Sequence, residues 1–351
     1  MKPLQKGLFL FYTNKGILTF VLLTLTMDFQ SIFELKSSDE FQAKALEAFS
    51  YQYKNNAVYH KFCSLLGKNQ NNVTHLKDVP FLPIDFFKSK KIVSTSKIPK
   101  TIFTSSGTTG SITSKHYVLD TNIYEDSYLN AFKLFYGEIS NYCVLALLPS
   151  YLERKGSSLI YMVDDLIKKS KHPESGFYLN ELDLLKKKIQ ELDAKGTKIL
   201  LIGVSFALLD MVEKHSLQLK HTVVMETGGM KGRRKEMIRE ELHAILKKGF
   251  GVEHIHSEYG MTELLSQGYS KGDGIFNAPP WMKILIRDPE DPLTYLSPGK
   301  TGGVNVIDLA NIHSCAFIAT QDLGKAYPNG SFEVLGRFDN SDIRGCNLMV
   351  L

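Results

Sequence analysis

The sequence predicts an α/β fold in which a sheet is flanked by helices and a small β subdomain lies near the C-terminus. From about residue 100 onward, short apolar runs alternate with amphipathic stretches, which is the pattern of buried strands covered by helices. The last 50 residues hold more glycine and shorter apolar runs, as expected of the β subdomain. A chain of 351 residues is long enough to bury one large core or two smaller ones.

The composition is that of an ordinary globular protein, with 43% apolar and 23% charged residues. The formal net charge of +5 is small for this length and fits an anionic small-molecule substrate. It gives no case for nucleic acid as a partner, which would call for a clustered basic stripe. The lysine-rich stretches 88–100 and 168–171 are short and broken by polar residues, so we interpret them as solvated surface.

The first part of the chain differs in character from the rest. Two apolar clusters, 8–12 and 17–25, are too short to span a membrane, which takes about 18 uninterrupted apolar residues. Small residues at a plausible signal-cleavage point are missing. A regular helical pattern follows Met27. We therefore expect 1–26 to be an over-extended start or disordered leader and 27–351 to be one domain, with a signal or anchor and real structure as the alternatives.

Four cysteines are scattered along the chain and form no CxxC pair. They are Cys63, Cys143, Cys315 and Cys346. A disulfide framework is improbable at this density, so the sequence predicts a reducing, cytoplasmic location.

The N-terminal elements begin with a predicted helix over 37–66. Ser37 and Glu40 have the spacing of a capping box, and apolar residues follow at helical period. The segment VPFLPIDFF (79–87) carries two prolines, so it is predicted to pack as a rigid connector rather than a regular helix.

The central elements are short apolar runs and amphipathic helices. The runs predicted to be buried strands are 142–149, 198–204, 221–226 and 252–257. The stretches 180–196 and 235–249 read as helices that end at Gly196 and Gly249. This alternation predicts helices on the faces of a sheet.

The most distinctive local pattern is TIFTSSGTTGS (101–111). Its glycines and hydroxyl residues leave many backbone N–H groups and hydroxyl donors free to wrap phosphate oxygens. It is not a Walker A sequence, because no Lys-Ser or Lys-Thr pair follows the second glycine. Lys115 lies five residues on and could reach a phosphate as a point charge. An ordinary polar hairpin loop explains the composition equally well.

A second cluster, SEYGMTELLSQ (257–267), directly follows a predicted strand. The C-terminal end of a strand is where α/β sheets place ligand groups. Tyr259 could stack on a base, and Glu263 could hold Mg²⁺ against phosphate oxygens. The alternative is a glycine turn followed by helix-capping residues.

Two weaker patterns complete the set. The glycine pair of METGGMKG (225–232) would let a flat ligand approach the backbone, although a strand-to-helix turn explains it too. Asp322 in ATQDLG and Arg337 in GRFDNSDIRGCNL are a carboxylate and a guanidinium suited to a ribose diol. By themselves they would be interpreted as a surface ion pair.

Together, in this order and spacing, the four patterns resemble the motifs of the adenylate-forming superfamily, which read SSGTTG, YGxTE, TxDxG and GRxDxxIR. The resemblance extends from about 79 to 348. Three segments are similar to the LuxE-type acyl-protein synthetases in particular: VPFLPIDFFK, LPSYLERKGSSLIYMV and IHSEYGMTELLSQ.

This resemblance implies ATP and Mg²⁺ as cofactors and assigns roles to individual residues. The residues implied to hold the ATP phosphates are Ser105, Ser106, Gly107, Thr108, Thr109, Gly110 and Thr262. It implies that Gly228 and Gly229 border the adenine, with Tyr259 stacking on it. Glu263 would serve Mg²⁺ bound through ATP. Asp322 and Arg337 would fix the ribose.

The resemblance also implies a nucleophile. Full-length adenylate-forming enzymes continue into a mobile lid domain that supplies a lysine, whereas this chain stops five residues after Cys346, so we expect the lid domain to be absent. LuxE-type synthetases are similarly short and are thought to carry the acyl group on a cysteine near the C-terminus. Cys346 stands where that cysteine should be, although a small buried cysteine is the alternative. Arg344 could lower its pKa by charge proximity.

The function expected from the resemblance is ATP-dependent activation of a fatty or other carboxylic acid as acyl-AMP, followed by transfer to a protein cysteine. An acyl-acceptor protein or a reductase would be the partner. Two alternatives stay open: an acyltransferase that kept the fold but does not adenylate, and a non-catalytic nucleotide-binding protein.

Overall fold

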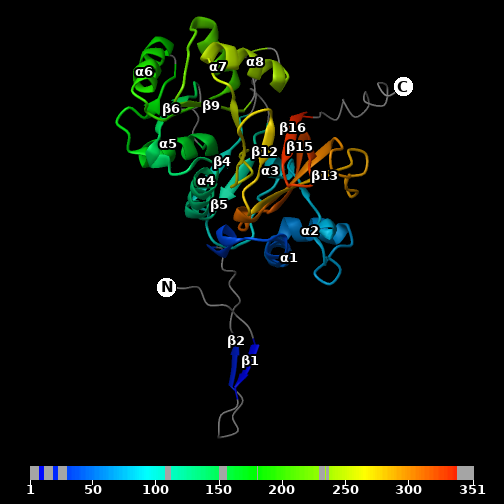
Figure 1. The fold of residues 1–351 in the computed structure, drawn as a ribbon. Coiled ribbons are helices and arrows are strands. Elements are labelled where there is room, and N and C mark those ends of the chain that lie inside the picture. The colour runs from blue at the N-terminus through cyan, green and yellow to red at the C-terminus, as the bar shows by residue number, and fades with distance from the viewer. Residues whose placement is uncertain are drawn as a thin grey trace, which may run out of the picture.

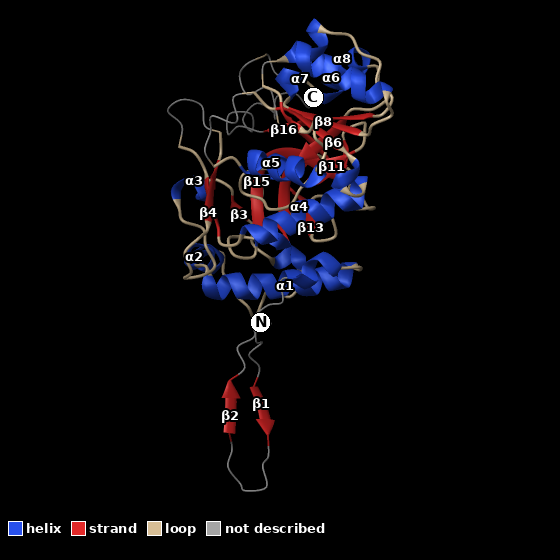
Figure 2. Cartoon of the chain, turned by 90° about the vertical axis from the view of Figure 1, so that its left-hand side faces the viewer, coloured by secondary structure: helices blue, strands red, loops and turns tan. Residues whose placement is uncertain are grey.

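The structure is a computed structural model, and it shows helices packed around one large sheet (Figure 1). It describes residues 8–11, 19–22, 30–106, 112–149, 156–179, 181–228, 234 and 237–337. Within the N-terminal part, strands β1 (Leu8–Phe11) and β2 (Thr19–Leu22) pair antiparallel as a sheet of their own. This hairpin stands apart from the body of the molecule in both views (Figures 1 and 2).

The first half of the large sheet is parallel. Its strands, in spatial order, are β7 (Gly176–Phe177), β6 (Cys143–Leu147), β8 (Ile199–Gly203), β9 (Thr222–Thr227) and β10 (His256–Tyr259). Every residue of β6 and β8 is buried, as expected of parallel strands covered on both faces. The long helices of this half are α4 (Thr121–Tyr136), α5 (Ser158–Ser170), α6 (Leu182–Ala194), α7 (Ser205–Lys214) and α8 (Arg239–Phe250).

The second half of the sheet is antiparallel. Its strands are β11 (Gly268–Ser270), β12 (Ile275–Asn277), β13 (Met282–Arg287), β14 (Gly302–Asp308), β15 (Phe317–Ala326) and β16 (Phe332–Arg337). The α/β class is confirmed, and β strands fill the C-terminal part as expected. Pairing of β12 with β16 makes them continuous with the parallel half rather than a detached unit.

Two smaller pieces complete the β structure. The short strand β3 (Leu82–Pro83), in the proline-rich connector, pairs with β15. Strands β4 (Thr101–Thr104) and β5 (Lys115–Val118) form a separate antiparallel hairpin. The remaining short helices are α3 (Phe86–Ser89), η1 (Gln30–Glu34), η2 (Leu76–Asp78), η3 (Ile139–Asn141) and η4 (Leu309–Asn311).

The single helix expected over 37–66 is divided in two. Helices α1 (Ser38–Asn55) and α2 (Ala57–Leu65) meet at Asn56, whose side-chain oxygen accepts hydrogen bonds from the first backbone N–H groups of α2. Asparagine competes well at a helix N-terminus, so a new helix starts there. The capping box of Ser37 and Glu40 is confirmed. Both helices lie at the end of the molecule opposite α6, α7 and α8 (Figure 2).

Two other element boundaries differ from the sequence prediction. Strand β10 begins at His256 and includes Tyr259, so the predicted strand 252–257 is shifted. Helix α8 begins at Arg239 instead of residue 235 and ends at Phe250 instead of Gly249. Its cap is Gly251, which adopts a left-handed φ of 66°. A Cβ on Gly249 would lie 2.3 Å from the Cβ of Val212, so this glycine lets α8 approach α7 closely. A packing glycine and a capping glycine look the same in sequence.

The described helices do not include one that is both long and apolar enough to cross a bilayer.

One buried carboxylate fixes the entry to β9, and it gives a test of the fold. Asp193 of α6 accepts hydrogen bonds from the backbone N–H groups of Lys220 and His221, at 3.0 and 2.8 Å. It also accepts one from the Thr222 hydroxyl at 2.8 Å. Asp193→Ala should lower the free energy of unfolding by roughly 2–4 kcal/mol, because several donors lose their partner. Urea unfolding measures the change.

The matched control is Asp183→Ala on the same helix. Asp183 pairs with Lys214 at 2.6 Å, and both side chains are more than half exposed. Exposed ion pairs add little to stability. Equal destabilisation by the two variants would contradict the role given to Asp193.

Candidate active site

The predicted phosphate loop follows β4 in the sequence and precedes β5. Ser105 and Ser114 close its base, with backbone N–H to carbonyl at 3.1 Å and the Ser114 N–H donating to the Ser105 hydroxyl at 2.9 Å. Ser106 follows and is exposed. Lys115 starts β5, opposite Thr104, and its side chain is exposed. Gly107, Thr108, Thr109 and Gly110 lie outside the described residues, so their role in phosphate binding stays a prediction.

Tyr259 is a buried residue of the site. Its ring contacts the rings of Phe276 and Phe332, at centroid distances of 6.1 and 5.7 Å. Its hydroxyl donates to Asp322 at 2.7 Å, and only 8% of the residue is exposed. Burial, reinforced by the neighbouring Asp322 carboxylate, raises the pKa of Tyr259. The tyrosine therefore holds the carboxylate, a contact that the sequence did not indicate.

Asp322 and Arg337 lie directly opposite each other on β15 and β16. The Arg337 Nε lies 3.4 Å from one Asp322 oxygen, while the other oxygen accepts from Tyr259. The Asp322 side chain is 9% exposed and that of Arg337 is 77% exposed. The sequence prediction that these two residues act together fits this geometry, and the guanidinium remains open to a ligand.

Gly228 lies at the end of β9, beside the end of β10. It is exposed, has a φ of 69°, and its carbonyl accepts a 2.7 Å hydrogen bond from the Ser205 hydroxyl. A positive φ is accessible to glycine at little cost, so the residue type suits this turn. Gly229 lies outside the described residues.

Glu263 is almost fully buried, with 5% of its surface exposed. Burial raises the pKa of its carboxyl. A hydrogen bond from Ser114 and the charges of Arg337 and Lys88 act in the opposite direction. Burial thus disfavours the ionised form in the free protein, and a nearby cation would favour it.

The donor set fits a magnesium ion carried by a nucleotide. Among the residues that the structure describes, no group of three or more histidine, cysteine, aspartate or glutamate side chains could hold a metal ion. Protein sites for Mg²⁺ commonly supply one or two carboxylates and leave the rest to substrate phosphates and water. A single carboxylate at Glu263 is consistent with that mode.

A buried histidine, which the sequence analysis missed, connects the hairpin to the loop after β10. The His116 ring of β5 donates from Nδ1 to the Thr262 carbonyl at 2.8 Å. Its Nε2 lies 2.9 Å from the side-chain oxygen of Asn311, whose amide donates to the Glu263 carbonyl at 2.7 Å. Burial lowers the pKa of His116 to about 4. The backbone of the Thr262–Glu263 pair is held on two sides.

Asp308 holds the next residues of the same loop. Its carboxylate accepts from the backbone N–H groups of Leu265 and Ser266, at 2.7 and 3.1 Å, and from the Ser266 hydroxyl at 2.5 Å. Asp308 is fully buried, and burial raises its pKa to about 6. No sequence motif marks His116, Asn311 or Asp308, because their importance depends on contacts between distant segments.

The described cysteines are poor candidates for the nucleophile. Cys63, Cys143 and Cys315 are all buried free thiols. Burial raises the pKa of Cys63 to about 12 and that of Cys143 to about 11, and it raises the pKa of Cys315 as well. Nucleophilic cysteines react as thiolates, which these environments disfavour. Cys346 and Arg344 lie outside the described residues, so the predicted nucleophile remains a prediction.

The structure therefore brings the described motif residues into one region. Tyr259 joins the β10 loop to Asp322, and Ser114 and His116 join it to the hairpin. Parallel strands β9 and β10 place Gly228 next to the same loop. A nucleotide with a ribose, a phosphate chain and a metal ion would meet complementary groups on each of these segments.

Comparison with known proteins shows which families this chain is similar to. Residues 22–124 match the model of the family described as "Acyl-protein synthetase, LuxE". The long-chain-fatty-acid–luciferin-component ligase of Vibrio harveyi is 23% identical over 324 residues, covering 86% of this chain and 84% of the relative.

Solved structures show the same fold at low identity. A 2-hydroxyisobutyryl-CoA ligase in complex with 2-HIB-AMP and CoA superposes with a TM-score of 0.64 and 11% identity, over 97% of this chain and 76% of the ligase. ATP-bound MatB from Rhodopseudomonas palustris gives a TM-score of 0.50 and 18% identity, over 67% of this chain. The match spans about half of MatB, 47% of its length.

The family match covers the N-terminal third of the chain, and the ligase relative covers most of it. They confirm the resemblance to the LuxE-type acyl-protein synthetases and support an enzyme of the acid–thiol ligase class, with the α/β fold of adenylate-forming ligases.

Proposed function

We propose that this protein activates a carboxylic acid with ATP, forming acyl-AMP and pyrophosphate, and then passes the acyl group to a cysteine thiol. The main support for this proposal is that four motif residues lie together near the base of the β4–β5 hairpin. They are Tyr259, Glu263, Asp322 and Arg337. The Vibrio harveyi relative is named for a long-chain fatty acid, so a fatty acid is the proposed substrate class. A cytoplasmic location and an acyl-accepting protein partner belong to the same proposal.

In the first step, a carboxylate oxygen of the acid attacks the α-phosphorus of ATP, and the bond to pyrophosphate breaks. Both reactants are anions, so the site must offset their repulsion. Donors of the hairpin loop and Lys115 would contact the phosphates. Asp322, held by Tyr259, would accept hydrogen bonds from the ribose hydroxyls, and Arg337 would lie at the same diol.

Glu263 is the residue that would hold Mg²⁺, which when bound neutralises phosphate charge. The surrounding groups keep this carboxylate in place. His116 and Asn311 fix the backbone on either side of it, and Ser114 donates a hydrogen bond to its side chain. The carboxylate is thereby preorganised rather than recruited on binding.

In the second step, the thiolate of Cys346 attacks the carbonyl carbon of the mixed anhydride. A thioester forms, and AMP leaves with the bonding electron pair of the acyl–phosphate linkage. Cysteine is suited to this step because its thiolate is a strong nucleophile at neutral pH. Arg344, two residues earlier in the sequence, would favour the thiolate by its charge.

The first prediction concerns adenylation itself. Carboxylate-dependent ATP–pyrophosphate exchange should be measurable across a panel of fatty acids, and Glu263→Ala should lower its rate by orders of magnitude. Because burial raises the pKa of Glu263, the wild-type rate should begin to fall, as the pH decreases, above the usual glutamate pKa of about 4.3. Unchanged exchange in Glu263→Ala would remove this residue from the metal role. An acyltransferase without adenylation would show no exchange in the wild type.

The second prediction concerns the ribose. Asp322→Ala should weaken ATP binding by roughly 1.5–3 kcal/mol, the range for hydrogen bonds to a charged group. Tyr259→Phe removes only the hydroxyl that holds the carboxylate, so its effect should be in the same direction and smaller. Isothermal titration calorimetry with ATP measures both. An unaltered ATP affinity in Asp322→Ala would contradict the ribose assignment.

The third prediction separates the two steps. Cys346→Ser should leave pyrophosphate exchange largely intact and abolish hydroxylamine-sensitive labelling by radioactive fatty acid plus ATP. Acyl-AMP formation does not need the thiol, whereas a serine hydroxyl is a far poorer nucleophile at neutral pH. Cys63→Ala, Cys143→Ala and Cys315→Ala are the controls, because these thiols are buried. Loss of label in a control variant but not in Cys346→Ser would show that the nucleophile is misplaced.

A further inference from the structure

The connector between the N-terminal helices and the β4–β5 hairpin runs through the edge of the site. Its strand β3 pairs with β15, where Leu82 and Pro83 lie opposite Ile318 and Ala319. The pairing is extended by a hydrogen bond from the Ile84 N–H to the Ala319 carbonyl at 3.0 Å. The connector is therefore fixed three residues before Asp322 along β15.

Helix α3 then turns toward the hairpin. Phe87 is 1% exposed, and its ring meets the ring of His116 edge-on, at 5.8 Å and an interplanar angle of 88°. His116 is the residue that holds the Thr262 carbonyl. The α3 segment is thus packed against the contact that joins the hairpin to the β10 loop.

The next residue, Lys88, is oriented by an acidic neighbour. Its Nζ lies 2.7 Å from one oxygen of Asp85, and the other oxygen of Asp85 accepts from Gln321 at 2.8 Å. Gln321 directly precedes Asp322. The Lys88 side chain is 41% exposed and that of Asp85 is 51% exposed, so the ammonium group is accessible to a ligand.

These contacts place Lys88 beside the site. It follows Phe87, whose ring meets His116, and its partner Asp85 accepts a hydrogen bond from Gln321, the residue before Asp322. Arg337 already contacts Asp322. Lys88 instead pairs with an exposed carboxylate, and exposed pairs are weak enough to be exchanged for a multiply charged anion. Lys88 is exposed, in agreement with the interpretation of 88–100 as solvated surface.

We propose that Lys88 is a phosphate-binding residue. When a nucleotide binds beside Glu263, the Lys88 ammonium group gives up its ion pair with Asp85 and contacts the phosphate chain. The inference rests on the proposed nucleotide site but not on the acyl-transfer step. It gives the connector a role in substrate binding in addition to packing. An ammonium group suits this role because it is a compact point charge with three donors.

The test compares Lys88→Gln with Lys90→Ala, an exposed lysine two residues further along the same segment. Affinities for ATP and for adenosine are measured by calorimetry, alongside the melting temperature. Lys88→Gln should weaken ATP binding roughly tenfold or more and leave adenosine binding unchanged, because only ATP carries the phosphates. Lys88→Arg should restore most of the ATP affinity. Lys90→Ala should bind both ligands as the wild type does.

Unchanged ATP affinity in Lys88→Gln would overturn the proposal, and so would an equal loss of adenosine affinity, which would indicate a structural role. If Lys88→Gln loses affinity for ATP but not for adenosine, while the wild type catalyses no pyrophosphate exchange, Lys88 is supported as a phosphate ligand and adenylation is refuted. If Lys88→Gln catalyses pyrophosphate exchange and binds ATP as tightly as the wild type, adenylation is supported and the role of Lys88 is refuted.

Discussion

The hydrogen bonds that join the β4–β5 hairpin to the loop after β10 are the constraint on which the site depends. The two strands form their own sheet, so backbone ladder bonds do not fix their position relative to the large sheet. That position is set by a hydrogen bond from the Thr104 N–H to the Gly156 carbonyl at 2.8 Å and by side chains. Among these is His116, which is 1% exposed, donates to the Thr262 carbonyl and lies beside the Asn311 side chain. The proposed function depends on this contact, because a nucleotide would have to meet the hairpin and Glu263 at the same time.

The N-terminal helices stabilise the backbone around Asn311, the residue that lies beside His116. Gln52 of α1 is fully buried and donates to the carbonyls of Asn311 and Ile312, at 3.1 and 2.9 Å, while its own oxygen accepts from the Ala316 N–H at 3.0 Å. Asn56 adds a bond to the Ser314 carbonyl at 3.0 Å. These amides hold the backbone that carries Asn311. Buried amides without partners are costly, so this arrangement is strongly specified.

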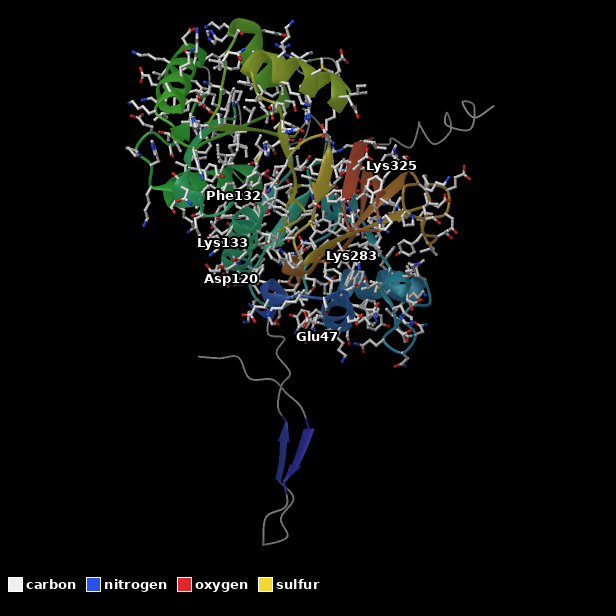
Figure 3. The ribbon with its side chains drawn as sticks, in the orientation of Figure 1. Glu47, Asp120, Phe132, Lys133, Lys283 and Lys325 are labelled. Carbon is white, nitrogen blue, oxygen red and sulfur yellow. The ribbon has the colours of Figure 1, made fainter. Side chains whose placement is uncertain are left out.

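Further contacts join α1 to the antiparallel strands. The ammonium group of Lys283 on β13 lies 5.4 Å from the ring centroid of Phe41 on α1, and Figure 3 labels Lys283 above the N-terminal helices. The ring of Phe317 on β15 meets Phe49 and Tyr59, at 6.4 and 6.1 Å. Since the N-terminal segment packs on the strands that carry Asp322, it belongs to the architecture of the site and not to a separate module.

Much of the fold could be predicted because hydrophobic period and length are local properties. The parallel strands β6 and β8 lie within the predicted runs, and β9 extends one residue beyond its run. Helix α6 ends before Gly196, whose φ of 77° suits a helix terminus. The failures have tertiary causes. Asn56 divides a helix because its side chain accepts hydrogen bonds from the backbone at the start of α2. Gly249 serves helix packing because a larger side chain there would collide with Val212.

The site shows the same division between local and tertiary information. The candidate residues came from motifs that resemble those of the adenylate-forming superfamily, and the motifs are local in sequence. These residues are Tyr259, Glu263, Asp322 and Arg337. The residues that position them were missed, since nothing in KHYV or IDLANI marks His116, Asp308 or Asn311 as buried partners of a distant loop. The hydroxyl of Tyr259 illustrates the limit. Its aromatic character was visible in the sequence, but its bond to a carboxylate 63 residues away was not.

The last feature of the site is its buried carboxyl groups. Glu263, Asp308 and Asp322 are buried carboxyl groups, and burial raises the pKa of Glu263 and Asp308. Under the proposed function, a cation brought in with the nucleotide would reverse this effect at Glu263, because it would favour the ionised form. Ligand binding and ionisation of Glu263 would then be coupled, and each would strengthen the other. An anionic substrate would be accepted beside buried carboxyl groups because the compensating charge would arrive with it and from the exposed guanidinium of Arg337.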